Sequence, residues 1–179
     1  PVGQPVPLSF AQERLWFLAQ LAPDNPFYNV PVGLDLEGPL DVPALRRALE
    51  QIVERHESLR TLCLSQGGRP VQVVQPLDGP VGFHFEQLEM PAQALEGWSS
   101  SRSLHNCDLS NELPIRAWLV RTEPNHHRLL IVLHHIVSDG WSMGVFVREL
   151  MALYASEDLP ELPVQYADLA LWQREWMSG

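Results

Sequence analysis

The chain has 179 residues, of which 45% are hydrophobic and 19% are charged, a composition typical of one globular domain with a buried core. Its formal net charge of −10 argues against a nucleic-acid-binding protein, which needs basic residues to neutralise phosphates. The sequence shows neither a signal segment nor an apolar run long enough to span a membrane, and its two cysteines form no CxxC pair. We therefore expect a cytoplasmic protein with no membrane partner, and packed free thiols at Cys63 and Cys107.

Apolar residues recur at helical spacing in some stretches of the chain and alternate in others. Ser9 and Asp41 are expected N-caps, because their side chains can accept a free backbone N–H of the first helical turn. Gly67 and Gly68 mark the turn of a β-hairpin. In chain order the sequence predicts a helix after Ser9, a strand within 27–38, a helix within 40–60, two strands within 59–76, a strand within 81–90, a helix within 90–110, two strands within 113–135 that turn at Pro124-Asn125, a helix over 141–155 and a last helix within 166–179.

Helices that alternate with strands and hairpins indicate an α/β (α+β) two-layer sandwich, in which helices cover a mixed β-sheet. Residues 129–134, LLIVLH, are apolar on both faces of the expected strand, so we expect this strand at the centre of the sheet. The chain contains no internal repeat and no long flexible linker. Residues 1–179 are therefore expected to fold as one unit.

The segment LHHIVSDGWS at 133–142 places two histidines at the end of the most apolar run of the chain. Adjacent residues on a strand point to opposite faces, so one of His134 and His135 should enter the fold and the other should face outward. Gly140 permits a sharp turn, and the helix after it directs free backbone N–H groups toward the same place. A histidine that exchanges protons near neutral pH, beside donors that stabilise negative charge, predicts a site for acyl chemistry.

Three other interpretations of this segment stay open from the residues alone. Both histidines could be hydrogen-bonded structural residues. His134, His135 and Asp139 could hold a metal ion, although the opposed side chains and the lack of a fourth ligand nearby disfavour it. A triad of Ser138, a histidine and Asp139 is disfavoured because three sequence neighbours rarely converge as nucleophile, base and orienting group.

Asp139 needs a partner if it is buried, because an unpaired internal carboxylate is costly. The best candidates are Arg55 and Arg60, in a segment that ends one helix and enters a strand. Arg60 lies between Leu59 and Leu62 in the sequence, which makes it the expected inward-facing arginine. The sequence therefore predicts a structural ion pair between Asp139 and Arg60.

Four blocks of the sequence, in order, resemble motifs of the condensation domains of nonribosomal peptide synthetases, in the chloramphenicol-acetyltransferase-like superfamily. They are SFAQERLWFL at 9–18, RHESLRT at 55–61, HHIVSDG at 134–140, which matches the HHxxxDG signature, and YADLALW at 166–172. Cys63 departs from the family, because the second motif usually continues there with an aromatic residue. The first block, with YNVP downstream, is more similar to the type that joins an L-configured donor to an L-amino acid.

The resemblance implies that an acyl or peptidyl group passes from the phosphopantetheine thioester of an upstream peptidyl carrier protein to the amine of an aminoacyl thioester on a downstream carrier. It makes His135 the active-site residue, lets His134 and Gly140 shape the loop, and gives Asp139 a structural ion pair, which we assign to Arg60. It implies no metal ion and no directly bound cofactor, because phosphopantetheine belongs to the carriers. His135 is expected to orient the attacking amine and stabilise the tetrahedral intermediate, more than to act as a strong base.

Members of this family are about twice as long and consist of two similar lobes with the active site between them. The resemblance therefore implies that residues 1–179 form the N-terminal lobe and that 159–179 lead toward a C-terminal lobe that this sequence lacks. Trp172 and Trp176 are expected to be exposed where that lobe would pack. Two alternatives stay open: a non-catalytic lobe that docks a carrier or neighbouring domain, and an epimerization or ester-forming relative, which shares the HHxxxDG block.

Overall fold

The computed structural model describes residues 2–23 and 25–178, without the side chain of Ser178. Pro1 and Gly179, the ends of the predicted unit, lie outside the described residues. The helices are α1 (Phe10–Leu21), α2 (Val42–Arg55), α3 (Ala92–Ser103), α4 (Gly140–Tyr154) and α5 (Tyr166–Ser178), with short 3-10 helices at Pro26–Tyr28 and Glu57–Arg60. The strands are β1 (Pro5–Pro7), β2 (Asn29–Glu37), β3 (Thr61–Gln66), β4 (Arg69–Val74), β5 (His84–Glu89), β6 (Ile115–Glu123) and β7 (His126–His134).

The larger sheet has four strands in the order β2-β7-β6-β5. β7 runs antiparallel to β2 and β6, whereas β5 and β6 are parallel. This arrangement confirms the predicted mixed sheet and the central place of β7, whose residues 129–134 are all buried. The strand that ends in the two histidines is therefore held on both edges, which fixes where it ends.

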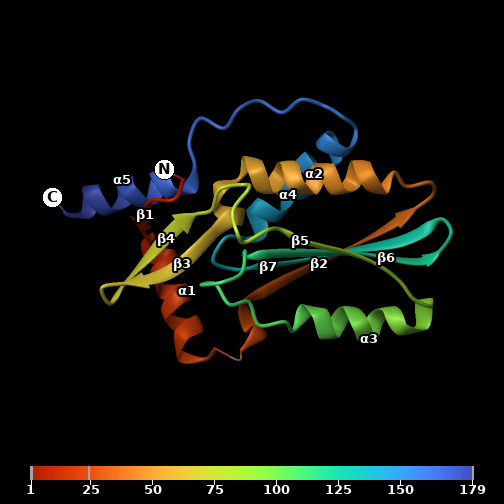
Figure 1. Cartoon of the computed structure of the whole chain (residues 1–179), viewed down its shortest axis with the longest axis horizontal. Helices are drawn as coiled ribbons and strands as arrows, with labels where there is room; N and C mark the ends of the chain where they lie inside the picture. Colours follow the sequence, from red (N-terminus) through yellow and green to blue (C-terminus); the bar gives the residue numbers. More distant parts are fainter. Residues whose placement is uncertain (1, 24, 179) are drawn as a thin grey trace.

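Helices cover both faces of this sheet (Figure 1). Because side chains alternate along a strand, Leu129, Ile131 and Leu133 pack against α2 and α4 in the main core. Leu130 and Val132 point the other way, toward Trp98 of α3. The predicted cover of helices on a mixed sheet is confirmed, and α3 adds a layer on the face opposite α2 and α4.

A second sheet, in the order β1-β4-β3, lies beside the first. Its β3–β4 hairpin turns at Gly67 and Gly68, where both φ angles are positive (59° and 78°), as the sequence predicted. β1 was not predicted, because three residues carry no periodic signal and its hydrogen bonds go to β4, far away in the sequence. The sequence also did not show that the hairpin belongs to a separate sheet.

Cys63, on β3, contacts Leu8, Leu109 and Ile136 in a small core under α1. Cys63 and Cys107 are free thiols, as predicted, and burial raises the pKa of each to about 12. The Cys63 thiol thus fills part of this small core. Within the part of the chain that the structure describes, no helix is long and apolar enough to cross a membrane.

Candidate active site

His134 is the last residue of β7 and its side chain is buried, with 5% of the residue exposed. Its backbone N–H donates to the Pro114 carbonyl at 2.9 Å. Its Nδ1 accepts a hydrogen bond from the backbone N–H of Ile136 at 3.0 Å. Burial, with a smaller effect from His135, lowers the pKa of His134 to about 4. His134 is therefore a neutral structural histidine that fixes the turn after β7.

His135 is exposed, on the other side of the chain from His134. Its backbone N–H donates to the carbonyl of Tyr28 at 2.7 Å, so the main chain is held in place while the imidazole faces solvent. The prediction that one histidine enters the fold and the other faces outward is confirmed. Of the two, only the side chain of His135 is accessible from solvent.

Ser138 and Asp139 complete the loop between β7 and α4. The Ser138 hydroxyl donates to the His134 carbonyl at 3.1 Å and is buried. Asp139 is the N-cap of α4: its Oδ1 accepts the backbone N–H of Ser142 at 2.8 Å, and its own N–H donates to the Ser142 hydroxyl at 2.8 Å. Hydrogen bonding to the carboxylate by the backbone N–H and the side chain of Ser142 lowers the pKa of Asp139. With its hydroxyl bonded to a carbonyl, Ser138 does not form a triad with Asp139.

The predicted ion pair between Asp139 and Arg60 is wrong. Asp139 is exposed and caps α4, and among the described residues it lies within 4 Å of no cationic group. Arg60 is buried, and its Nη1 donates to the Gln75 carbonyl at 2.5 Å. It also contacts the Glu54 carbonyl at 3.4 Å and the Glu57 carboxylate at 3.6 Å. Asp139 caps the helix instead, because the backbone N–H of Ser142, three residues away, satisfies the carboxylate with little loss of conformational entropy.

Arg60 is nevertheless an inward-facing arginine, as predicted, and it joins the end of α2 to β4. The other arginine candidate, Arg55, lies 3.4 Å from Glu149 of α4. Glu149 also lies 2.6 Å from His56 Nε2. Sequence reasoning did not identify this pair of contacts, and the only signal for them was Glu149, the single acidic residue of α4. The second block is thus joined to α4, the helix that follows the HHxxxDG loop at 134–140, which is called the signature loop below.

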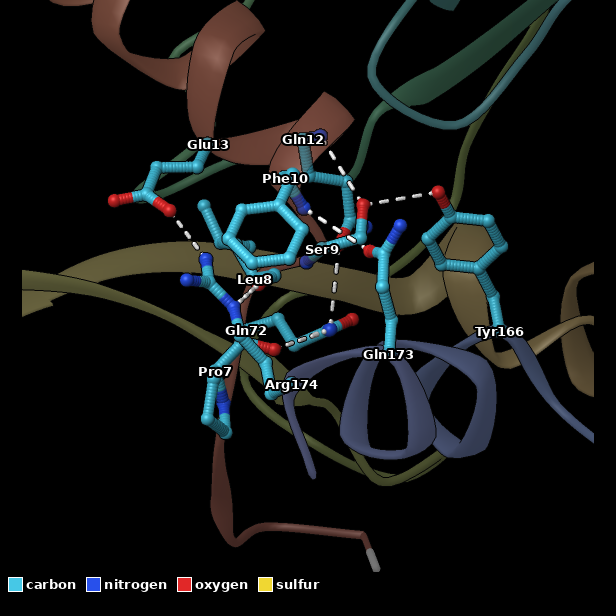
Figure 2. Close-up of polar contacts among 10 residues, drawn as sticks. All are labelled: Pro7, Leu8, Ser9, Phe10, Gln12, Glu13, Gln72, Tyr166, Gln173 and Arg174. Carbon is cyan, nitrogen blue, oxygen red and sulfur yellow. Dashed lines mark hydrogen bonds and ion pairs between the residues drawn. The ribbon is translucent and has the colours of Figure 1, made fainter. Parts of the chain in front are cut away.

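The first and fourth blocks meet in the fold (Figure 2). The Ser9 hydroxyl, which caps α1, lies 3.0 Å from the Tyr166 hydroxyl at the start of α5. About two turns further along α5, Gln173 accepts the backbone N–H of Phe10 at 3.3 Å. Its neighbour Arg174 donates to the Leu8 carbonyl at 2.9 Å and pairs with Glu13. α5 therefore has a fixed orientation against the start of α1.

Gln165, just before α5, connects the same region to the second block. Its amide donates to the Arg55 carbonyl at 3.0 Å, and its Oε1 accepts the backbone N–H of Glu57 at 3.1 Å. The first and fourth blocks, separated by 157 positions between Ser9 and Tyr166, are thus in direct contact. Ile136 and Val137 of the signature loop belong to the same apolar cluster as Leu15 and Trp16 of the first block.

On α5, Trp172 and Trp176 are exposed by 58% and 73%, as predicted, and their rings are stacked with centroids 6.0 Å apart. Leu169 and Met177 are also exposed on this helix. Over residues 2–23 and 25–178, no group of three or more His, Cys, Asp or Glu side chains is arranged to hold a metal ion. His134, His135 and Asp139 in particular form no such group.

The geometry agrees with comparisons with known proteins. The model of the condensation-domain family matches residues 2–178, almost the whole chain. This chain belongs to the condensation-domain family. One of the linear gramicidin synthase proteins of Brevibacillus parabrevis is 47% identical to it over 184 residues, which cover 97% of this chain and 2% of that protein. Chondramide synthase cmdD of Chondromyces crocatus is 45% identical over 186 residues, which cover 98% of this chain and 5% of that protein.

Solved structures give the same family and fold. The X-domain in its complex with OxyB from teicoplanin biosynthesis is 30% identical, with a TM-score of 0.89, over 98% of this condensation domain and 39% of that chain. The starter condensation domain of the rhizomide synthetase RzmA has a TM-score of 0.86 at 19% identity, over 98% of this chain and 44% of that chain. The chain thus spans less than half of these structures, and the predicted mixed sheet covered by helices is confirmed as the fold of condensation-domain structures.

Proposed function

We propose that this condensation domain forms peptide bonds in a nonribosomal peptide synthetase, with His135 in the active site. The observation that supports the proposal most directly is the exposed side chain of His135, which follows the central strand and the buried neutral His134, and whose backbone N–H donates to the Tyr28 carbonyl. Ile136 and Val137 of this loop pack in one apolar cluster with Leu15 and Trp16 of the first block, which helps to fix the loop. Such rigidity is what a positioning residue requires, because misplacement by about 1 Å can reduce rates on the order of 100-fold.

In the proposed reaction, the amine of an aminoacyl thioester on the downstream carrier attacks the thioester carbonyl of the upstream carrier. A C–N bond forms, the C–S bond breaks, and the phosphopantetheine thiolate leaves. The amine proton is lost and the thiolate gains a proton, so the exchange is balanced. His135 orients the amine and stabilises the tetrahedral intermediate, and its imidazole can pass the proton. His134 and Gly140 shape the loop. No acyl-enzyme is needed, because the thioester is already activated.

The proposal includes a second lobe and two carrier proteins. Residues 1–179 would be the N-terminal lobe, and 159–179 would lead toward a C-terminal lobe. The coverage of 39% and 44% of the solved chains supports this arrangement, as does the exposed aromatic pair on α5. The phosphopantetheine would belong to the carriers, with no cofactor bound by the lobe itself. We place the reaction in the cytoplasm, without a nucleic-acid or membrane partner.

The experiment is an intact-mass condensation assay with a peptidyl-loaded donor carrier and an aminoacyl-loaded acceptor carrier. It compares the wild type with His135→Ala, and with His126→Ala as the matched control, because His126 is an exposed histidine at the far end of the same strand. The assay uses the 179-residue chain and any longer natural polypeptide that contains it. In a polypeptide that contains both lobes, we expect the donor mass to move to the acceptor carrier in the wild type and in His126→Ala, and not in His135→Ala. The 179-residue chain tests whether this lobe acts alone.

The same assay separates the alternatives. A lobe that only docks carriers would give the same result for His135→Ala as for the wild type, which would overturn the proposal. An epimerization relative would invert a stereocentre of the donor without transferring mass. An ester-forming relative would act on a hydroxyacyl acceptor and leave the aminoacyl acceptor unchanged.

A further inference from the structure

A cavity of about 160 Å³ lies between the end of β7, the 3-10 helix at Glu57–Arg60 and the first turns of α4. Its walls extend from the core to the surface, since Leu133 and Phe146 are 2% and 6% exposed whereas Trp141 at its rim is 83% exposed. A cavity with this range of exposure is reachable from solvent. Its apolar walls are formed by Leu59, Leu133, Val137, Met143, Val145 and Phe146.

The cavity lies next to the candidate active-site residue. Val137 and Ser138, which line it, follow His135 closely in the loop after β7. Asp139 caps α4, and the first turn of α4 forms one wall of the cavity. The cavity and His135 therefore flank the same N-terminus of α4.

Three of the polar side chains at the cavity, those of Ser138, Ser142 and His56, already have partners inside the protein. The Ser138 hydroxyl donates to the His134 carbonyl, the Ser142 hydroxyl belongs to the capping box of α4, and His56 Nε2 contacts Glu149. A ligand is therefore not required to satisfy these groups. The surface that remains is apolar, and it favours an apolar group over a charged or strongly polar one.

We propose that this cavity binds the aliphatic or aromatic side chain of a carrier-bound amino acid, and so helps to select the substrate that reacts at His135. The inference rests on the proposed function, which supplies a substrate with a side chain near His135. The size fits, because an apolar cavity of about 150 Å³ binds benzene. Met143 and Val145 both belong to α4 and line the cavity, so substitutions at these positions change its size.

The test measures binding rather than turnover. The probes are the pantetheine amides of leucine and of alanine, in which an amide replaces the labile thioester. They are titrated into the 179-residue chain labelled with ¹³C at Met, Val and Leu methyls. We expect the leucine probe to bind more tightly than the alanine probe, by on the order of tenfold or more, because it buries about three more carbon groups. The shifted methyl resonances should be those of Met143, Val137 and Val145.

Two variants alter the cavity in opposite directions. Val145→Trp fills it and should abolish the preference for leucine, whereas Met151→Trp, on the exposed side of the same helix, should keep it. Met143→Ala enlarges the cavity and should shift the preference toward the corresponding phenylalanine probe. This second variant provides the test if Val145→Trp does not fold, as judged by its thermal unfolding transition.

Equal binding of the leucine and alanine probes would overturn the inference, as would a leucine preference that survives Val145→Trp. The result can be distinguished from failure of the proposed function. His135→Ala should keep the leucine preference while it loses condensation. If condensation depends on His135 but the two probes bind equally, the cavity assignment fails and the proposed function stands.

Discussion

The backbone N–H of Ile136 donates a hydrogen bond to Nδ1 of His134 at 3.0 Å. Because Nδ1 accepts this bond, the proton of the neutral ring is on Nε2. Protonation of Nδ1 would break the hydrogen bond and place a charge in a buried site, and burial indeed lowers the pKa of His134 to about 4. The two histidines of the signature thus differ in role: His134 supports the turn, and His135 is presented to solvent.

This difference predicts a pH dependence of stability. The pKa of His134 is lowered from 6.5 to about 4 by folding, so below pH 6.5 the unfolded chain binds a proton that the folded chain does not. The free energy of unfolding should therefore fall as the pH decreases from 6.5 to 4, by about 3 kcal/mol from this residue alone. The measurement is urea denaturation at several pH values for the wild type and for His134→Gln. Parallel pH profiles for the two proteins would contradict the assignment.

The cap at Asp139 gives a second prediction. Asp139→Ala should lower the free energy of unfolding by about 1 kcal/mol, the usual cost of losing an N-cap, because the backbone N–H of Ser142 loses its acceptor. Loss of one partner of a buried ion pair would cost about 3–5 kcal/mol instead. Asp139→Asn should retain most of the stability, since asparagine also caps helices well. Urea denaturation of the two variants is the measurement.

A double-mutant cycle of Asp139→Ala with Arg60→Ala tests the correction directly. The two residues share no contact in the structure, so their effects should add within about 0.5 kcal/mol. Arg60→Ala alone should cost about 2–3 kcal/mol, because it removes the donor to the Gln75 carbonyl and leaves Glu57 without this partner. A coupling energy above about 1 kcal/mol would show that the two side chains interact, and would contradict the correction.

The contacts of Glu149 give a third prediction. Glu149→Gln should lower the free energy of unfolding by about 2 kcal/mol, since it weakens the contacts to His56 and Arg55, both largely buried. The matched control is Glu50→Gln, in the exposed pair with Arg46 on α2, where the effect should stay within about 0.5 kcal/mol. Thermal unfolding of both variants at low and at high salt is the measurement. Equal losses in the two variants would mean that the buried contact adds nothing.

The link between the first and fourth blocks gives a fourth prediction. Tyr166→Phe removes the hydroxyl that lies 3.0 Å from the Ser9 hydroxyl and should cost about 1 kcal/mol. Because the lost contact holds the start of α5, amide hydrogen exchange should accelerate in α5 more than in α2. Trp176→Phe serves as the control, since Trp176 is exposed on the same helix. Unchanged protection of α5 in Tyr166→Phe would show that the contact does not hold this helix.

Local patterns in the sequence determined most of the elements and the caps. Ser9 and Asp41 cap their helices as predicted, because a cap depends on a residue and the three that follow it. The hairpin and the central strand were also predicted from short stretches of sequence, the Gly67-Gly68 turn and the apolar run at 129–134. The opposite directions of His134 and His135 also follow from strand geometry alone.

The partner of Asp139, the second sheet and the cavity beside α4 were decided by the tertiary structure. Each depends on which groups, distant in the sequence, lie close together in the fold. Sequence spacing does not show whether the Asp139 carboxylate will bind a local donor, such as the Ser142 N–H, or a distant one, such as Arg60. Glu149 shows the same limit, because its pairing with His56 and Arg55 requires α2 and α4 to pack side by side. The sequence alone thus determined which residues cap, turn and alternate, whereas packing of the helices on the sheet decided which polar groups became partners.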